Sequence, residues 1–422
     1  MTAASEQPVD HVPRVVDADR RSFLVRLLDQ GLWSAGFFLV NATAAFTMTA
    51  ADFAALSIAT AIAFIAVAVM RSWGVYSFVV VSGRRHRPAA AFVDGHAAWR
   101  GAFVCATVGA VVTGAWLSER ASTGLALLFA LLGALIVVSD LPRQLLIAVG
   151  AHTRTLPLSS VYLVGGVVTT VAFLLPVGAT FTVVAWLLML VLVTIVGLVL
   201  GPRGRARERD PVEHKRVAWR LSAEALYLSI AGQAGLLLLF ALHDPTSTAG
   251  LRFAYSLVFA PAFVLLQGLQ PLMVRQAASA AALGARRSVR LATEWCLGQA
   301  TLLAAVGGVI GVALWLFADA AGPRAALPFI VPLGVSIVSA QVFETALMAA
   351  RFYLDPEVVH RTRLVVVLLD VGSQALGIVI GGPVGLAVAL VVFGLARLLL
   401  SSAGLVLLRR IDTDVVTTGS PA

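Results

Sequence analysis

Charged residues are scarce in this chain of 422 residues: they make up 13% of it, whereas hydrophobic residues make up 59%. A soluble domain carries roughly 25% charged residues, because its surface must stay largely polar. This much apolar surface cannot be hidden in a water-soluble core. The composition therefore excludes a soluble enzyme, a nucleic-acid-binding domain and a disordered protein, and it indicates a membrane protein with many spanning segments.

Cysteines and catalytic motifs are scarce as well. The two cysteines, Cys105 and Cys296, lie within apolar stretches and predict neither a disulfide framework nor a metal site. No Gly-rich phosphate loop, zinc-ligand spacing or nucleophile motif occurs, so we expect neither an enzyme nor a bound cofactor. Residues 1–20 are polar and lack the apolar centre of a cleavable signal peptide.

Long apolar stretches dominate what is present, and a spanning helix needs about 20 such residues. Twelve stretches lie at 27–48, 53–81, 99–117, 123–149, 156–176, 179–200, 221–242, 249–275, 292–317, 325–350, 362–380 and 383–408. The alternating pattern of a β-barrel is absent, and open strands cannot pair their backbone groups in lipid. The sequence therefore predicts an all-α polytopic membrane protein with twelve transmembrane helices.

The basic residues predict the orientation of these helices. Lys215 is the one lysine, so arginine supplies almost all of the 31 basic residues. When the chain is threaded from the inside, its outer connections hold only Arg120, Arg252 and Arg324. Because basic residues are retained on the cytoplasmic side, we predict that both termini are cytoplasmic and that the protein lies in the cytoplasmic membrane. The net charge of +9 then reflects topology, and no nucleic-acid partner is expected.

The longest inner connection divides the helices into two sets of six. The predicted domains are a cytoplasmic tail (1–26), a six-helix lobe (27–200), a linker (201–220), a second six-helix lobe (221–408) and a cytoplasmic tail (409–422). The halves share weak similarity, since Asp29 follows Arg26 and Glu224 follows Arg220 at corresponding helix starts. Two lobes of parallel topology are typical of transporters with a substrate path between them. The alternative is that the similarity between the halves is a coincidence, which is common in a sequence of such apolar composition.

Ionisable residues within spanning segments are costly and are therefore candidates for function. They are Arg71, Asp140, Arg143, Glu344, Asp370 and Arg397, with Asp29 and Glu224 near inner helix ends. They either line a polar cavity or reach the membrane–water interface on the cytoplasmic side. For Arg71 the favoured interpretation is snorkelling, in which the long side chain extends so that its charge reaches that interface. Asp140 and Arg143 are spaced for an ion pair on one helix face. Arg397 is far from both ends of its helix, which predicts a buried ion pair or a substrate contact.

Prolines in or near the predicted helices should bend them, because each removes a backbone hydrogen bond. These residues are Pro142, Pro261, Pro271, Pro328 and Pro332. The stretches 249–275 and 325–350 carry two each, so we expect these helices to bend most in a conformational change.

Dispersed motifs resemble those of one group of membrane proteins. The first predicted helix opens with Asp29-Gln30-Gly31-Leu32-Trp33-Ser34, and the second opens with Asp52-Phe53-Ala54. The fourth ends with Asp140-Leu141-Pro142-Arg143. The eighth contains Gly250-Leu251-Arg252-Phe253-Ala254, followed by Pro261 and Gln267-Gly268. In these motifs and in its helix count, the chain resembles the polysaccharide transporter branch, the Wzx-like flippases, of the multidrug/oligosaccharidyl-lipid/polysaccharide exporter superfamily. Phe37 departs from the pattern, which has an Asn at that place.

The resemblance implies that the protein flips or exports a polyprenyl-diphosphate-linked glycan by alternating access. The implied substrate contacts are Arg71 for the diphosphate, Gln30, Gln267 and Gln270 for the sugars, and Arg397. The implied gating or ion-coupling carboxylates are Asp29, Glu224, Asp370 and Glu344. Membrane lipids, and a glycan polymerase or glycosyltransferases, are the implied partners.

Several alternatives stay open at this point. Asp29 and Glu224 either close the inner mouth by pairing across the lobes or form local ion pairs with Arg26 and Arg220. An ion-coupled multidrug or cation antiporter of the same superfamily would need an unpaired acidic residue deep in a lobe, whereas the carboxylates here lie near inner helix ends. A non-transporting membrane partner of a glycan assembly complex is disfavoured by the short outer connections.

Overall fold

The computed structural model describes residues 12–84, 93–175, 178–201, 211–258, 285–316, 321–350 and 353–418, and the regular structure within these ranges is entirely helical. The first half of the chain forms α1 (Val12–Thr47), α2 (Ala50–Arg71), the π-helix η1 (Ser72–Tyr76), α3 (Ser77–Arg84), α4 (Gly95–Leu117), α5 (Thr123–Ala148), the short η3 (His152–Arg154), α6 (Thr155–Leu174) and α7 (Gly178–Leu200). The second half forms α8 (Pro211–Leu242), a helix at 245–258, α10 (Ala285–Leu316), α11 (Ala321–Ala350) and α12 (Pro356–Thr418).

The helices coincide with the apolar stretches of the sequence. Each of the twelve stretches overlaps a helix in the part of the chain that the structure describes. Eight helices in that part are long and apolar enough to cross a membrane. The all-α, multi-pass prediction is therefore confirmed, while the exact number of crossings stays a prediction.

Several helices run beyond the predicted membrane limits. α1 begins at Val12, within the predicted tail 1–26, and α8 begins at Pro211, within the predicted linker 201–220. α12 continues to Thr418, into the predicted tail 409–422. An α-helix pairs its backbone groups internally, so it can leave the lipid and continue through polar residues. The apolar stretches therefore predict the membrane portion of a helix and not its full length.

α12 is two helices joined at a sharp break. Its apolar part covers 51 residues, or roughly 76 Å at 1.5 Å per residue, which is more than twice a hydrocarbon core of roughly 30 Å. The break is at Gly382, whose φ of 58° lies in the left-handed region that glycine tolerates. It falls between the two stretches predicted at 362–380 and 383–408.

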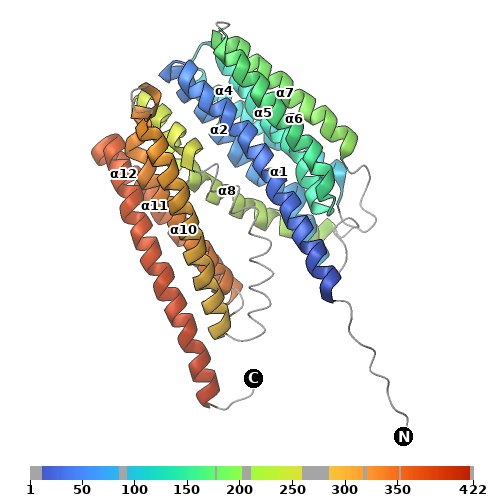
Figure 1. Ribbon diagram of the computed structural model, residues 1–422, viewed down its shortest axis with the longest axis vertical. Helices are drawn as coiled ribbons and strands as arrows, with labels where there is room; N and C mark the ends of the chain where they lie inside the picture. The colour runs from blue at the N-terminus through green and yellow to red at the C-terminus, as the bar shows by residue number, and fades with distance from the viewer. Residues whose placement is uncertain are drawn as a thin grey trace.

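The helices form two bundles with α8 between them (Figure 1). The first bundle consists of α1–α7, in which α5 packs against α2, α4 and α7, and α1 packs against α6. The second bundle consists of α10–α12, with α11 packed on α12, and of the helix at 245–258, whose Gly250 lies against the backbone of Ala325 on α11. α8 contacts α2, η1 and α3 on one side and α12 on the other. α8 is thus the structural link between the bundles.

The two ends of the helical chain lie together. α1 begins and α12 ends at the same end of the molecule (Figure 1). This arrangement agrees with two termini on one side of the membrane, and the assignment of that side to the cytoplasm stays a prediction.

Side-chain caps and close helix contacts explain how the sequence specifies these elements. Thr49 and Asp94 accept hydrogen bonds from the backbone N–H groups of Asp52 (3.2 Å) and Ala97 (3.1 Å), which satisfies free donors at the starts of α2 and α4. Where α1 crosses α6, a Cβ added to Gly166 would lie 2.8 Å from the carbonyl oxygen of Gly36. Small residues at this crossing therefore let the two backbones approach closely.

Asp244 caps the helix at 245–258. Its carboxylate accepts hydrogen bonds from the backbone N–H (2.9 Å) and the hydroxyl (2.8 Å) of Ser247. Slight burial raises the pKa of Asp244, but these hydrogen bonds outweigh it and hold the pKa below its ordinary value.

The irregular positions agree only in part with the proline pattern. Pro142 lies inside α5, and Pro328 and Pro332 lie inside α11, whereas Pro261 and Pro271 lie outside the described residues.

A π-helix, η1, interrupts the α2–α3 helix directly after Arg71, and the N–H of Ser77 bonds to the carbonyl of Ser72 five residues earlier. π-Helices of this kind occur frequently at functional sites.

Candidate functional site

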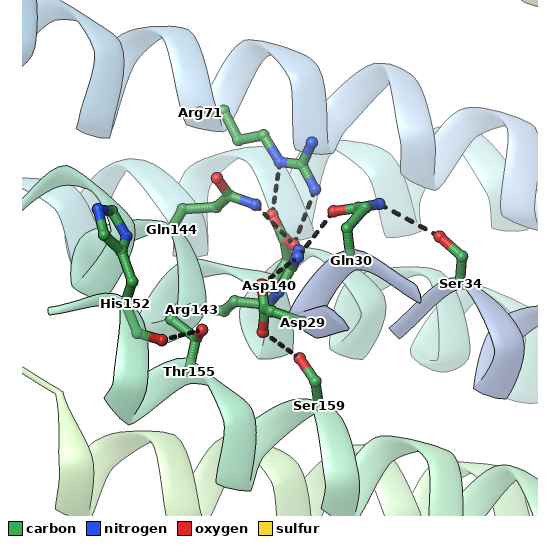
Figure 2. Close-up of polar contacts among 10 residues, drawn as sticks. All are labelled: Asp29, Gln30, Ser34, Arg71, Asp140, Arg143, Gln144, His152, Thr155 and Ser159. Carbon is green, nitrogen blue, oxygen red and sulfur yellow. Dashed lines mark hydrogen bonds and ion pairs between the residues drawn. The ribbon is translucent and has the colours of Figure 1, made fainter. Parts of the chain in front are cut away.

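Four charged side chains meet within the first bundle (Figure 2). The guanidinium of Arg71 donates from Nε and Nη2 to both oxygens of Asp140, at 2.6 and 2.8 Å. Gln144 also donates to Asp140, at 3.3 Å. The Asp140 side chain is 3% exposed and that of Arg71 is 19% exposed. This bidentate geometry is the strongest arrangement available to an arginine and a carboxylate.

The second pair of this network joins α1 to α5. Arg143 donates to the Oδ2 atom of Asp29 from Nε (3.0 Å) and Nη2 (2.7 Å), and to the Oε1 atom of Gln30 (2.7 Å). Ser159 on α6 donates to the other oxygen of Asp29 at 2.6 Å. The Asp29 and Arg143 side chains are only 2–3% exposed. Three helices are thereby held together by one satisfied ion pair.

The ion pair predicted between Asp140 and Arg143 is not formed. Each of these residues reaches a different helix: Asp140 bonds to Arg71 on α2, and Arg143 bonds to Asp29 on α1. A pair within α5 would leave two other buried charges, Arg71 and Asp29, without partners, at a cost of several kcal/mol each. Pairing across helices neutralises all four charges. Sequence spacing alone could not reveal this choice.

The second bundle also contains buried ion pairs, one of which extends to the linking helix α8. Arg363 on α12 pairs with Glu224 on α8 and with Glu344 on α11, the latter at 2.6 Å. Arg397 donates to Asp370 at 2.8 Å, and Gln374 donates to the same carboxylate at 2.9 Å. Arg397 is therefore in a buried ion pair, which was one of its two predicted roles.

The site residues predicted from the sequence are brought together only in part. Arg71 is neither free nor snorkelling, because Asp140 holds its guanidinium. Asp29 and Glu224 pair neither with each other nor with Arg26 and Arg220, since their partners are arginines on other helices. Gln30 bonds to Arg143 and to Ser34. Gln267 and Gln270 lie outside the described residues.

Arg252 is a site residue that the sequence interpretation missed. The charge count assigns it to an outer connection, at the start of the stretch 249–275, and no role was predicted for it. In the structure, Asp244 and Pro245 start a helix that carries Arg252 about 12 Å further along its axis. The side chain is 4% exposed and extends toward the first bundle. Its Nη2 donates to the Oδ1 atom of Asn41 on α1 at 3.4 Å, and the guanidinium lies 5.8 Å from the Phe37 ring and 5.6 Å from the Phe64 ring. The sequence does contain a signal for this burial: Arg252 follows the capping residue Asp244 by about two helical turns, which places it inside a helix.

Besides buried aliphatic packing, aromatic contacts join the first bundle to α8 and to the helix at 245–258. Phe46 on α1 meets Phe253 edge-on, with 5.5 Å between ring centroids. Arg120 lies 5.0 Å over the ring of Phe240 on α8. Near the start of α8, Trp219 meets Trp73 of η1 edge-on at 5.5 Å. These contacts are individually weak, at roughly 0.5–1.5 kcal/mol each, so they can be broken and remade.

α8 is fixed to the first bundle at its start and to the second bundle further along. His214 on α8 stacks on Phe78 and hydrogen-bonds to the hydroxyl of Ser77 at 2.8 Å. Ten residues later, Glu224 pairs with Arg363 of α12. Within the described residues, no group of three or more His, Cys, Asp or Glu side chains could hold a metal ion. The arrangement is thus two helix bundles with internal ion pairs, a linking helix that packs on both, and apolar, aromatic and long polar contacts between them.

Solved structures with a similar fold include MATE transporters. A variant of the Vibrio cholerae MATE transporter VcmN matches with a TM-score of 0.61 and 14% identity, over 92% of this chain and 96% of that chain. MATE family transporters of the MOP superfamily match in an outward-facing conformation (TM-score 0.56, 14% identity, 95% and 97% coverage) and an inward-facing one (0.54, 13%, 92% and 96%). No protein family model and no curated protein matches the chain.

At these identities the comparison establishes the fold: the chain has the fold of MATE transporters of the MOP superfamily. That fold agrees with the superfamily that the sequence motifs indicate. Nothing in the comparison points to the polysaccharide branch of the superfamily.

Proposed function

We propose that this protein is a membrane transporter that works by alternating access of its two helix bundles. The observation that carries the proposal is the distribution of the buried ion pairs. Asp29–Arg143 and Arg71–Asp140 each join helices of the first bundle, and Asp370–Arg397 joins the two arms of α12 in the second. Each bundle is therefore tied together internally.

The energies favour motion between the bundles over motion within them. Separating a buried pair such as Asp29 and Arg143 leaves uncompensated charges and costs about 3–5 kcal/mol. Besides the apolar packing of α8 on α2, η1 and α3, the polar contacts that link the first bundle to α8 and to the helix at 245–258 are long hydrogen bonds. They measure 3.4 Å for Arg252 to Asn41 and 3.5 Å for Arg120 to the Ala241 carbonyl on α8. Apolar packing is non-directional and can be exchanged for other apolar contacts, whereas the buried ion pairs cannot, so two internally paired bodies fit alternating access.

The fold comparison favours a transporter of small amphipathic molecules over a glycan transporter, because the matching solved structures are multidrug transporters. Ion coupling through Asp29, Asp140 or Asp370 would require an arginine pair to open first, since each of these carboxylates is bound to an arginine. Transport of a polyprenyl-diphosphate-linked glycan is the second candidate. It is favoured by one observation: the motif residues Asp29, Gln30, Asp140 and Arg143, dispersed in sequence, gather in one place.

Alternating access can be tested without a known substrate. Ser34 lies on α1, is partly exposed, and is followed along the helix by Phe37, which contacts Arg252. In a cysteine-free background, a cysteine at Ser34 should react with a membrane-impermeant maleimide added to either side of the membrane. Cross-linking cysteines at Phe46 and Phe253 should hold one end closed, abolish labelling from that side and leave labelling from the other side.

Tyr227 and His360 provide the matched control. Their ring centroids are 6.0 Å apart, but they join α8 to α12 and do not bridge the two bundles. Cross-linking cysteines at these two positions should leave labelling from both sides unchanged. Labelling from one side only, in the protein without any cross-link, would contradict alternating access.

A further inference from the structure

Arg252 carries a buried charge without a counter-charge in the described structure. Its contacts among the described residues are one long hydrogen bond to the neutral Asn41 and the faces of two phenylalanine rings, and its Nε has no hydrogen-bond partner there. The segment that follows, residues 259–284, contains no Asp or Glu. All other arginines buried within the described membrane helices, Arg143, Arg363 and Arg397, are bound to carboxylates.

We propose that Arg252 binds the anionic group of an amphipathic ligand that enters between the two bundles. The ligand class is a phosphate, sulfonate or carboxylate attached to an apolar body. This inference rests on the proposed transport function and names the chemistry of its substrate.

The geometry around Arg252 fits such a ligand. The guanidinium keeps Nε available, and a phosphate or carboxylate can accept from Nε and one Nη nitrogen together. Phe37 and Phe64 are only partly buried, so their rings form an apolar border through which a ligand can approach. An unpaired charge in a dry site is costly, and an anion bound there would remove that cost.

The position of Arg252 connects ligand binding to the motion of the bundles. Arg252 belongs to the helix at 245–258, whereas Asn41, Phe37 and Phe64 belong to the first bundle. When the bundles separate, Arg252 must lose these contacts and gain access to whatever lies between them. An anionic ligand would then bind preferentially to the open state, which is how a substrate shifts a conformational equilibrium.

Three probes with matched chemistry test the proposal on the full-length protein in lipid nanodiscs. Dodecyl phosphate presents an anion on an apolar chain, dodecyltrimethylammonium presents a cation on the same chain, and inorganic phosphate presents the anion alone. Binding of each is measured by tryptophan fluorescence. We expect dodecyl phosphate to bind at least about tenfold more tightly than dodecyltrimethylammonium, and Arg252→Gln to weaken dodecyl phosphate about tenfold to hundredfold. Arg252→Lys should recover part of the loss.

Arg120 supplies the control substitution. It also contacts the other side of the interface between the bundles through the Ala241 carbonyl and the Phe240 ring, but it is exposed. Arg120→Gln removes the same charge and should leave the affinity for dodecyl phosphate unchanged. Comparable binding of inorganic phosphate would support the anion site with a free anion as its ligand, and weaker binding would support an amphipathic one.

Two results would overturn the inference: unchanged affinity of Arg252→Gln for dodecyl phosphate, or equal affinity of the wild-type protein for the cationic probe. Neither result bears on alternating access, which is measured separately by the labelling of Ser34→Cys. Conversely, if Arg252 binds the anion but Ser34→Cys is labelled from one side only, the anion site would stand and the transport function would be rejected.

Discussion

The Asp29–Arg143 pair is expected to be costly to break, because removing one partner leaves the other charge buried without a counter-charge. Both side chains are almost completely buried, and Arg143 makes three hydrogen bonds, two to Asp29 and one to Gln30. Asp29→Asn would leave the Arg143 charge buried with only neutral partners. Breaking a buried pair in this way costs about 3–5 kcal/mol. We therefore expect a large loss of stability without any direct effect on substrate contacts.

A double-mutant cycle separates the pair from the individual residues. Asp29→Asn and Arg143→Gln should each be strongly destabilising, whereas the double variant contains no unpaired charge and should recover much of the loss. The coupling energy should fall within about 0.5–3 kcal/mol, the range for contacting residues in one network. The free energy of unfolding would be measured in mixed micelles of dodecyl maltoside and sodium dodecyl sulfate.

The exposed pair of Arg290 and Glu294 is the control. Their side chains are 82% and 59% exposed, so Glu294→Gln should change the free energy of unfolding by less than about 0.5 kcal/mol. If Asp29→Asn also cost less than about 1 kcal/mol and combined additively with Arg143→Gln, the pair would not be structural. Asp29 would then be free to act as the gating carboxylate that the sequence resemblance implies.

Three further predictions concern single positions. Arg71→Lys should retain part of the stability that Arg71→Ala loses, measured in the same micelles, because lysine can pair with Asp140 but cannot bond to both of its oxygens in the fork geometry of arginine; equal loss in the two variants would contradict this. Gly382→Ala should lower the free energy of unfolding by about 1–2 kcal/mol, because alanine is strained at a φ of 58°, and no change would contradict the break as described. Asp244→Ala should lower the free energy of unfolding by about 1 kcal/mol at neutral pH through loss of the helix cap, whereas Asp244→Asn should lower it less. Because the pKa of Asp244 is lowered in the folded protein, its charge stabilises the fold above the ordinary pKa near 3.9, and this contribution is lost as the pH falls through the lowered value. The difference in stability between wild type and Asp244→Asn should therefore shrink on acidification, and a difference that grows would contradict the prediction.

The positions of the helices could be predicted from the sequence, and their interactions could not. Apolar stretches reveal the membrane portion of each helix because residues in the hydrocarbon core must be apolar. The division of α12 near Gly382 is likewise visible as a gap between two stretches. The extension of α1 to Val12 and of α8 to Pro211 is invisible in hydropathy, since helices outside lipid need no apolar residues.

The candidate site shows the same division. The residues that form the network, Asp29, Arg71, Asp140 and Arg143, stand out in the sequence because charge is rare in spanning segments. Their partners depend on which helices pack together, and this is a property of the whole fold that no local spacing contains. Arg252 was counted with the outer connection because the predicted stretch 249–275 places it near the start of its helix, whereas the helix begins earlier, at Pro245.

The central claim, that two rigid bundles move relative to each other, is tested most directly by distances between spin labels in a lipid bilayer. Exposed positions at both ends are available: Ser118 and Thr246 near one end, and His96 and Arg290 near the predicted cytoplasmic end. Pulsed electron–electron resonance on cysteine pairs at these positions should give two populations at each end. Cross-linking Phe46→Cys to Phe253→Cys should select the short Ser118–Thr246 distance and the long His96–Arg290 distance together.

A pair within the first bundle serves as the reference for rigidity. His96 and the exposed Thr153 lie on α4 and η3 of that bundle, so their distance should show one population that the cross-link does not change. The account predicts opposite changes at the two ends with the reference unchanged. A single, cross-link-independent distance at both ends, or a reference distance that changes with them, would contradict it.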